Sequence, residues 1–369
     1  GLYKIQSKSA PLRENTGGRF FLLAGIIHDT LPVMHWSLIL FVAAAAFTAT
    51  LAATGAIQWI FRRRAILDHP NERSSHSTPT PKGAGIAVIG CLTPLLVVLL
   101  WSIPVAGVTT DIIFAALALA ALSWFDDLKG LNPLIRLLAQ IAAVGFVLSL
   151  TWDTSVTANE YFGGLLGGGW DAAVAGLLWV WFINLFNFMD GIDGIAGVET
   201  AAIGTGAAVV VAIAGLAPLF GLFGIAMAAA AVGFLYWNWH PAKIFLGDVG
   251  SVPLGFLLGW LLLQLAAAGQ WAPAIILPLY YLADATITLV RRGMRGEKVW
   301  QAHRQHFYQR AVVRGLSHAH VVRYILLADL ALIACAVAAA RGWVSWALVS
   351  AMVVVSWLLY VLGRKPEKT

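Results

Sequence analysis

Long apolar runs alternate with short polar segments from residue 34 to the end of the chain. Each run holds roughly 20 residues, enough for a helix to cross a hydrocarbon core about 30 Å thick. Glycine and proline inside the runs do not oppose this, because transmembrane helices tolerate both. The pattern predicts eleven membrane-spanning helices, over residues 35–61, 84–105, 109–125, 133–151, 171–188, 195–214, 217–237, 252–268, 272–290, 320–340 and 343–362.

Residues 1–33 do not follow this pattern. They are polar and irregular at first, and the short apolar run after that is interrupted by histidine, aspartate and proline. This run is too short to span a membrane, and no small-residue cleavage site marks it as a signal peptide. We expect 1–33 to be an N-terminal extension of unclear status, with Met34 suited to a natural start. Residues 34–369 are expected to form a single transmembrane domain with large cytoplasmic loops at about 62–83 and 291–319.

The composition supports a membrane protein. The chain is 60% hydrophobic and 11% charged, whereas an ordinary soluble domain has about 25% charged residues. We therefore predict an all-α, polytopic integral membrane protein. Cys91 and Cys335 lie far apart in apolar spans, which argues against a disulfide framework or a CxxC metal site. The net charge of +6 is explained by basic residues retained on the cytoplasmic side, so no nucleic acid partner is expected.

The basic residues also give the orientation. If every predicted span reverses direction, 19 of the 20 Lys and Arg residues after residue 34 fall on one side or at the adjoining span ends, with Arg341 the exception. By the positive-inside rule this side is cytoplasmic. The sequence thus predicts an integral membrane protein whose basic side faces the cytoplasm. The basic run 291–314, taken alone, would indicate contact with membrane lipid head groups.

Polar clusters border the spans on the same side. They are "DHPNERSSHSTPTPKGAG" (68–85), "DDLKG" (126–130), "NLFNFMDGIDGIAG" (184–197), "FLGDVGS" (245–251) and "AHRQHFYQR" (302–310). Ionisable residues at membrane depth are costly and mark functional sites by default. We therefore predict an active-site cleft on the cytoplasmic face with five catalytic aspartates: Asp126, Asp127, Asp190, Asp193 and Asp248.

Several carboxylates close together need a positive counter-charge. Mg²⁺ supplies one, since it is held by one or two carboxylates together with waters and substrate phosphates. Asn184 and Asn187 are three residues apart, so they share one face of a helix, and neighbouring glycines allow a ligand to approach the backbone. Basic residues that can neutralise an anion are Lys82, Lys129, Arg136, Arg304 and Arg310. These features suit a phosphate or pyrophosphate substrate and, within a helical bundle, a lipid co-substrate.

Each cluster also has a structural explanation. "DDLKG" can be an acidic helix end, "FLGDVGS" a helix N-cap at Ser251, and His303 and His306 solvated interfacial residues. "DGIDG" with its upstream asparagines is the hardest to explain in this way. A different class of protein, an ion-coupled transporter, would carry ionisable residues near the middle of its spans. The clusters here lie at the cytoplasmic ends, which favours an enzyme.

Together the ordered motifs make the chain resemble the polyprenyl-phosphate N-acetylhexosamine-1-phosphate transferases, over residues of about 62–314. This superfamily (glycosyltransferase family 4 type) includes phospho-N-acetylmuramoyl-pentapeptide transferase and the enzymes that prime O-antigen, enterobacterial common antigen and teichoic acid synthesis. The resemblance implies transfer of a sugar 1-phosphate from a UDP-N-acetyl sugar to polyprenyl phosphate, with loss of UMP. It also implies dependence on Mg²⁺, with Mn²⁺ as a substitute, and a location in the cytoplasmic (inner) membrane of a prokaryote.

The resemblance assigns roles to individual residues. Asp248 matches the strongest metal ligand, and Asp126 and Asp127 match an acidic pair that handles the lipid phosphate or the metal. Asp190 and Asp193 match the nucleotide-facing segment. The residues expected to bind substrate are Lys82, Lys129, Arg136, Asn184, Asn187, Gly191, Ile192, Phe245, His303, Arg304 and His306, with Phe245 near the uracil.

One motif departs from the peptidoglycan branch. The muramoyl-pentapeptide enzyme has consecutive histidines in its last large loop, whereas this chain has "AHRQHFYQR". The difference favours the branch that primes O-antigen or capsular polysaccharide, with UDP-GlcNAc, UDP-FucNAc or UDP-QuiNAc as the donor, and keeps the peptidoglycan enzyme as the alternative. The identity of the sugar stays open. A homodimer is also open, since apolar spans do not reveal which face meets a partner.

Overall fold

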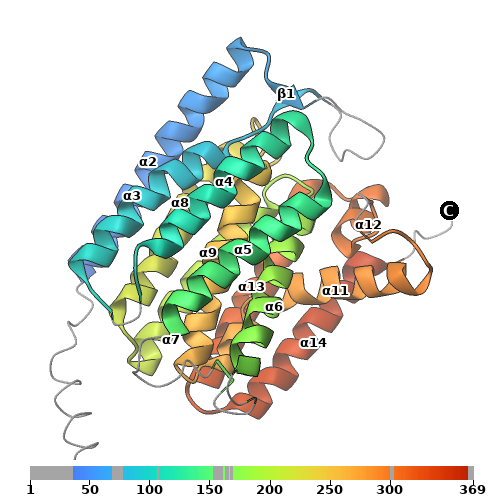
Figure 1. Cartoon of the computed structure of the whole chain (residues 1–369). Coiled ribbons are helices and arrows are strands. Elements are labelled where there is room, and N and C mark those ends of the chain that lie inside the picture. The colour runs from blue at the N-terminus through green and yellow to red at the C-terminus, as the bar shows by residue number, and fades with distance from the viewer. Residues whose placement is uncertain are drawn as a thin grey trace, which may run out of the picture. The chain divides into compact units, whose positions relative to one another are not determined.

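The computed structural model describes residues 36–68, 78–105, 108–152, 161–162, 166, 169–299 and 303–364. The expectation for residues 1–33 lies outside them, as do parts of both large loops. The described residues form the helices α2 (Trp36–Arg63), α3 (Gly85–Ser102), α4 (Asp111–Lys129), α5 (Pro133–Trp152), α6 (Gly169–Met189), α7 (Ile195–Ala214), α8 (Pro218–Asn238), α9 (Asp248–Ala267), α10 (Trp271–Ile276), α11 (Leu279–Met294), α12 (Phe307–Val313), α13 (His318–Ala340) and α14 (Val344–Gly363) (Figure 1). The all-α prediction is confirmed.

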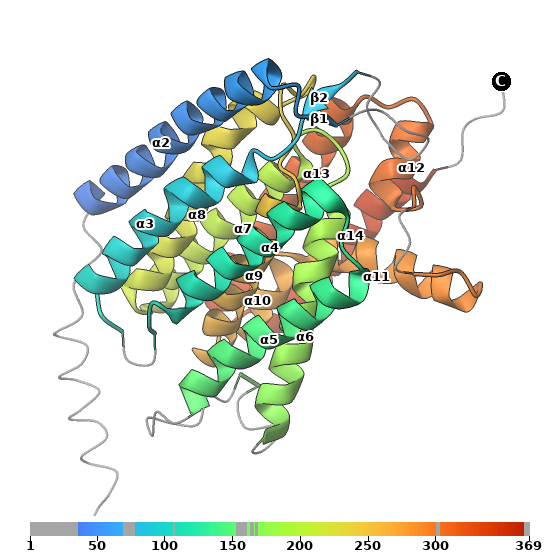
Figure 2. The same cartoon turned by 45° about the horizontal axis from the view of Figure 1, so that its top comes forward.

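The only sheet in the described part of the chain is a short antiparallel pair. It joins β1 (Leu67–Asp68) to β2 (Thr80–Pro81), with Leu67 opposite Pro81. This pair lies between α2 and α3, at the same end of the bundle as α12 (Figures 1 and 2). It therefore returns the first large loop to the region where the polar motifs meet.

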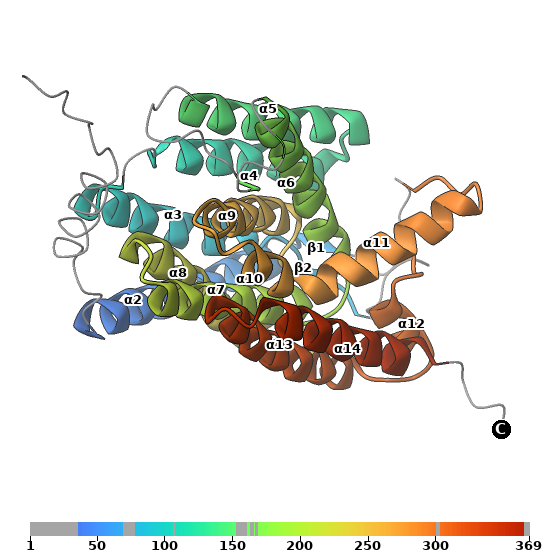
Figure 3. The same ribbon diagram turned by 90° about the horizontal axis from the view of Figure 1, so that it is seen from below.

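Nine of the eleven predicted spans coincide with described helices that are long and apolar enough to cross a membrane. The count of eleven is not confirmed. The span predicted at 109–125 overlaps α4, which begins two residues later and extends to a charged end; α4 carries Asp111, Asp126, Asp127 and Lys129. The span predicted at 272–290 is wrong as a single helix, because α10 ends at Ile276 and α11 begins at Leu279 after Pro278. Beyond this break, α11 runs outward from the bundle (Figures 2 and 3).

Helix α9 occupies the centre of the bundle. Viewed along the bundle in Figure 3, α3, α4, α6, α7, α8 and α10 surround it, and each contacts it. Of its apolar stretch 83% is buried, against 22% for the peripheral α2. Large apolar side chains such as Trp36 and Trp346 instead point outward, at 79% and 75% exposed. Such a surface suits a lipid surround, in which apolar side chains need no protein cover.

Candidate active site

Three of the predicted aspartates meet two basic side chains at one end of the bundle. Asp126 and Asp127 lie near the end of α4, and Asp248 begins α9. The Lys82 ammonium lies 2.7 Å from Asp127 Oδ1 and 3.9 Å from Asp248 Oδ1. The Arg136 guanidinium lies 2.8 Å from Asp126 Oδ2 and 3.4 Å from Asp248 Oδ2. Asp248 thus stands between both cations.

Backbone pairing brings Lys82 to this place. Residue Lys82 forms a parallel bridge with Phe245, whose N–H donates to the Pro81 carbonyl at 2.8 Å. The Phe245 carbonyl in turn accepts from the N–H of Gly83 at 3.0 Å. The first large loop and the "FLGD" segment are therefore joined by hydrogen bonds that do not depend on the side chains. Half-buried Phe245 belongs to this join.

A close approach of two glycines completes the join. Gly85 begins α3 and faces Gly250 in the first turn of α9, and a Cβ built on Gly85 would overlap the backbone nitrogen of Gly250. No residue with a side chain fits here without moving one helix. The start of α3, just after Lys82, therefore packs closely against the start of α9, which carries Asp248.

Asp127 has a structural task. Its Oδ1 accepts from the backbone N–H of Asp248 at 3.2 Å, and its Oδ2 accepts from that of Val249 at 3.0 Å. These are the first N–H groups of α9, which lack partners within their own helix. A carboxylate in this position caps the helix and suits its positive end. Both Asp127 oxygens are thus already engaged by protein donors.

Asp126 is engaged in a similar way. Its Oδ1 accepts from the Leu131 N–H at 2.6 Å, and its Oδ2 receives the Arg136 guanidinium. It therefore stabilises the turn from α4 to α5 and positions Arg136.

Asp248 has the weakest protein contacts of the three. Its Oδ2 lies 3.4 Å from both Arg136 and the Asn187 amide, long for a hydrogen bond, and 23% of its side chain is exposed. Its carboxylate is therefore the freest of the three for a ligand. Oxygen donors of this kind are those that Mg²⁺ prefers, so the residues fit the cation that the sequence predicts.

Asp190 interacts electrostatically with this group of charged side chains. Burial and then the Asp248 carboxylate raise the pKa of Asp190 to about 7, against the opposing effect of Lys82. Burial lowers the pKa of Lys82, but the Asp248 and Asp127 carboxylates outweigh it and the pKa stays raised. Lys82 is therefore a permanent cation, whereas Asp190 exchanges a proton near neutral pH.

A cavity of about 450 Å³ opens beside Arg136. Its walls combine the polar side chains of Gln140, Asn184 and Asn187 with leucines of α4 and α5. The Asn184 amide donates to Gln140 Oε1 at 2.5 Å, and Asn187 Oδ1 accepts from Ser251 at 2.9 Å. The helix face predicted to carry Asn184 and Asn187 thus lines this cavity, which is mainly apolar and has Arg136 as its charged lining residue.

The late histidine motif is buried and ordered by an aspartate. His306 is 1% exposed, and its Nδ1 lies 3.1 Å from Asp284 Oδ1. Asp284 also accepts from the N–H groups of Phe307 at 3.0 Å and Tyr308 at 3.3 Å, and so caps α12. The interpretation of His306 as a solvated residue is therefore wrong. Asp284 was not among the predicted site residues, although an acidic residue inside an apolar run is a usable signal.

The other predicted substrate-binding residues are spread around this region. The His303 ring lies 4.7 Å from that of His306, and burial, with His306 and Arg292, lowers its pKa to about 4. Arg304 is half-buried and Ile192 is buried. Gly191 packs directly against the Tyr308 hydroxyl, which donates to the Phe188 carbonyl at 3.2 Å.

Lys129 differs from the other basic residues. It is exposed at the end of α4, and no ion pair joins it to another residue that the structure describes. The sequence does not distinguish Lys129 from Arg136, but in the structure only Arg136 of these two forms ion pairs with the aspartates.

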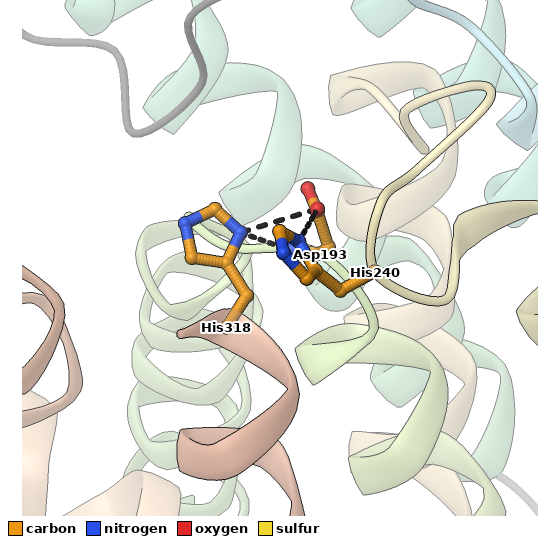
Figure 4. Close-up of side chains that lie close together, drawn as sticks. All are labelled: Asp193, His240 and His318. Carbon is orange, nitrogen blue, oxygen red and sulfur yellow. Dashed lines mark hydrogen bonds and ion pairs between the residues drawn. The ribbon is translucent and has the colours of Figure 1, made fainter. Parts of the chain in front are cut away.

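The fifth aspartate, Asp193, points elsewhere. Its Oδ2 lies 2.6 Å from His240 Nδ1 and 3.2 Å from His318 Nδ1 (Figure 4). Neither histidine was predicted as a site residue, because both lie far from Asp193 in the sequence.

Two further acidic residues lie inside the bundle. Glu199 of α7 is 0% and Asp329 of α13 is 1% exposed. Their carboxyl oxygens have no hydrogen-bond partner among the described residues. Both lie within predicted spans, where the sequence-based prediction placed no acidic site residue. The signal was again an acid in an apolar run.

Comparison with known proteins gives a consistent family. Residues 109–266 match glycosyl transferase family 4. A probable undecaprenyl-phosphate N-acetylglucosaminyl 1-phosphate transferase of Bacillus subtilis is 27% identical over 76% of this chain and 80% of its own. A decaprenyl-phosphate N-acetylglucosaminephosphotransferase of Mycobacterium tuberculosis is 26% identical over 75% of this chain and 76% of its own. A phospho-N-acetylmuramoyl-pentapeptide-transferase of Streptococcus thermophilus is 28% identical over 58% of this chain and 65% of its own.

The matched region contains "DDLKG", the "DGIDG" loop and "FLGD", and so includes Asp126, Asp127 and Asp248 of the charged group described above. The family match and the relatives agree with the resemblance read from the motifs. The family match over residues 109–266 and the relatives together support the polyprenyl-phosphate hexosamine-1-phosphate transferase superfamily for this chain.

Proposed function

We propose that the chain transfers an N-acetylhexosamine 1-phosphate from a UDP-sugar to polyprenyl phosphate, commonly undecaprenyl phosphate. UMP leaves and a polyprenyl-diphospho-sugar forms, the priming step of O-antigen or another cell-envelope polysaccharide. One observation carries the proposal: Asp248 lies between Lys82 and Arg136, beside a cavity with apolar walls. A charged centre next to an apolar space suits two substrates, one of them a phosphorylated lipid.

The cavity supplies the lipid side of the proposal. Its lining residue Leu134 is 58% exposed and lies on α5, whose apolar stretch is only 17% buried. Arg136 lies on the same helix and lines the same cavity. A polyprenyl chain can therefore contact the leucines while its phosphate meets the guanidinium, which binds phosphate oxygens in a bidentate manner.

The nucleotide side is assigned to the "DGIDG" loop and the late histidine motif. Gly191 and Tyr308 are in contact, so these two segments, more than a hundred residues apart, form one wall. His303 has its pKa lowered to about 4 and is neutral at pH 7. It therefore offers hydrogen bonds, not charge, to a donor sugar.

Mg²⁺ is the proposed cofactor, with Mn²⁺ as a substitute. Asp248 would hold it first, with Asp126 or Asp127 contributing only if they release some of their present donors. The cation would neutralise charge on the diphosphate. Lys82 and Arg136 neutralise the same charge from the protein and orient the phosphates.

We propose direct in-line transfer. An oxygen of the lipid phosphate bonds to the β-phosphorus of the UDP-sugar, and the bond from that phosphorus to the oxygen bridging it to UMP breaks. A phosphate monoester has a second pKa near 6 and is largely dianionic at pH 7, so the attack needs little help from a base. The alternative is a phospho-aspartate intermediate. Trapping one at any of the five aspartates would overturn the direct route.

The site is proposed to face the cytoplasm. The distribution of Lys and Arg supports this, since the exposed basic residues Arg62 and Arg63 end α2 at the same end of the bundle as the aspartates. The donor would then reach the site from water, and the lipid from the surrounding membrane.

The test is release of UMP by the purified protein with polyprenyl phosphate and a panel of UDP-N-acetyl sugars. The panel contains UDP-GlcNAc, UDP-FucNAc, UDP-QuiNAc and the UDP-muramoyl-pentapeptide. We expect UMP and a lipid-linked sugar with one of the first three, and loss of both with EDTA. Turnover of the pentapeptide alone would identify the peptidoglycan enzyme instead. Undiminished activity in EDTA would exclude the cation.

A further inference from the structure

Asp193, His240 and His318 form a compact cluster apart from the carboxylates around Asp248 (Figure 4). Asp193 comes from the loop between α6 and α7, His240 from the connection between α8 and α9, and His318 from the first turn of α13. Each offers one ligand atom, and these atoms all lie within 4.8 Å of one another. Three distant segments thus converge on one small volume.

The cluster is held in place by its surroundings. Asp193 and His318 have side chains only 7% and 8% exposed, whereas that of His240 is 36% exposed. The Ala242 N–H donates to Asp193 Oδ2 at 3.2 Å. On the other side of the loop, the Gly194 N–H donates to Asn238 Oδ1 at 2.8 Å. The backbone positions are therefore fixed before any ligand binds, and one side is open to water.

The side chains converge on Asp193 Oδ2, which lies 2.6 Å from His240 Nδ1 and 3.2 Å from His318 Nδ1. The imidazoles present Nδ1 atoms to the same oxygen. Two imidazole nitrogens and one carboxylate, with an open side for water, are the donor set of many zinc and other transition-metal sites.

We propose that Asp193, His240 and His318 form a second metal site, which takes a first-row divalent transition cation such as Zn²⁺. Imidazole suits such cations, while Mg²⁺ prefers oxygen donors, so the two sites select different metals. Zn–N and Zn–O distances of about 2.0–2.2 Å fit ligand atoms spaced as these are after small side-chain shifts. Ala242 would remain as a donor to the ligating carboxylate, as outer hydrogen bonds do in metal sites.

The bound cation would replace the proton between His240 and Asp193. It would tie the "DGIDG" loop, which also carries Asp190, to the start of α13. The site would therefore stabilise the DGIDG loop through its links to His240 and His318, without contact with the substrate phosphates. The proposal concerns metal binding and does not depend on the transferase reaction. The competing explanation is a metal-free ion pair of one carboxylate and two histidines.

The test is a cobalt titration of the full-length protein after tag removal and EDTA treatment, with excess Mg²⁺ present to fill the oxygen site. We expect one equivalent of Co²⁺ to give visible d–d absorption that Zn²⁺ abolishes. His240→Ala and His318→Ala should lose this absorption. His320→Ala is the matched control, because His320 lies two residues away, is exposed and bonds to Ser317. It should keep the absorption, as should Asp248→Asn.

The melting temperature is a second measurement, which distinguishes loss of metal binding from misfolding of a variant. Zn²⁺ should raise the melting temperature of the wild type and of His320→Ala, because a ligand that binds only the folded state stabilises it. It should not raise that of His240→Ala, the less buried of the two histidine variants. Absence of a tight cobalt site in the wild type, or an unchanged spectrum in His240→Ala, would overturn the proposal and leave the ion pair.

Discussion

The Asp127 carboxylate of α4 accepts a hydrogen bond from the backbone N–H of Asp248, at 3.2 Å, and thereby holds the first turn of α9. The sequence predicts a cation ligand at both positions, yet the two carboxylates have different contacts in the structure. Asp127 is occupied by helix N–H groups and Lys82, while Asp248 keeps only long contacts and partial exposure. A substitution of Asp127 should therefore lower the stability of the protein, whereas one of Asp248 should affect mainly turnover.

We predict that Asp248→Asn abolishes UMP release and leaves the melting temperature close to that of the wild type. Asp127→Ala should lower the free energy of unfolding by about 1 kcal/mol, the usual value of a helix cap, and should also reduce turnover through displacement of α9. Thermal melts and UMP release on the same preparations separate the two effects. Wild-type turnover in Asp248→Asn would refute the assignment of Asp248 as the main cation ligand.

A second prediction compares Arg136 with Lys129. Arg136→Gln should lower kcat/KM for polyprenyl phosphate by roughly 10–100-fold, which corresponds to losing a charged hydrogen bond of about 1.5–3 kcal/mol. Lys129→Gln removes the same charge from an exposed position of α4 and should change it less than about twofold. The measurement is initial rate against lipid concentration. Equal losses in both variants would mean that long-range charge, not contact with Arg136, binds the lipid phosphate.

The raised pKa of Asp190, about 7, predicts a pH effect on stability in EDTA. A carboxyl whose pKa is higher in the folded state stabilises the fold below its unfolded pKa, and this contribution is lost as pH rises through about 7. Asp190→Asn does not titrate. Its melting temperature relative to the wild type should therefore be higher at pH 8 than at pH 5. A pH-independent difference would show that Asp190 does not hold its proton in this range.

Glu199 and Asp329 give a prediction for the bundle interior. The two buried carboxyl groups lack described partners and influence each other electrostatically, and burying an unpaired carboxylate is costly. Glu199→Gln and Asp329→Asn should each preserve or raise the melting temperature, and the double variant should gain less than the sum because the groups interact. A marked loss of stability in either single variant would instead indicate a bound ligand between them.

The sequence predicted the helical membrane bundle because apolar length and basic-residue distribution are properties of single segments. It also predicted that "DDLKG" and "FLGD" meet, since both lie at span ends on one side. The interruption before α11 was missed because one proline changes the mean hydropathy of an apolar run only slightly, whereas the helix breaks between Ile276 and Leu279. His240 and His318 could not be paired with Asp193 from spacing, because α7 and α8 lie between the DGIDG loop and His240 and only the fold closes that distance.

The different tasks of Asp126, Asp127 and Asp248 were also beyond the sequence. All three are aspartates next to a span end, and only the directions of backbone N–H groups distinguish a capping carboxylate from a free one. The same holds for Asp284, whose task is fixed by the N–H groups of α12.

The contact between Gly85 and Gly250 affects how a genetic screen of this protein should be read. Neither residue has a functional group, yet the alignment of Lys82 with Asp248 depends on the lack of a methyl group at both positions. Substitutions there would give the same null phenotype as loss of a catalytic aspartate. Screening by activity alone would therefore assign chemistry to two residues whose only contribution is the space that they leave free.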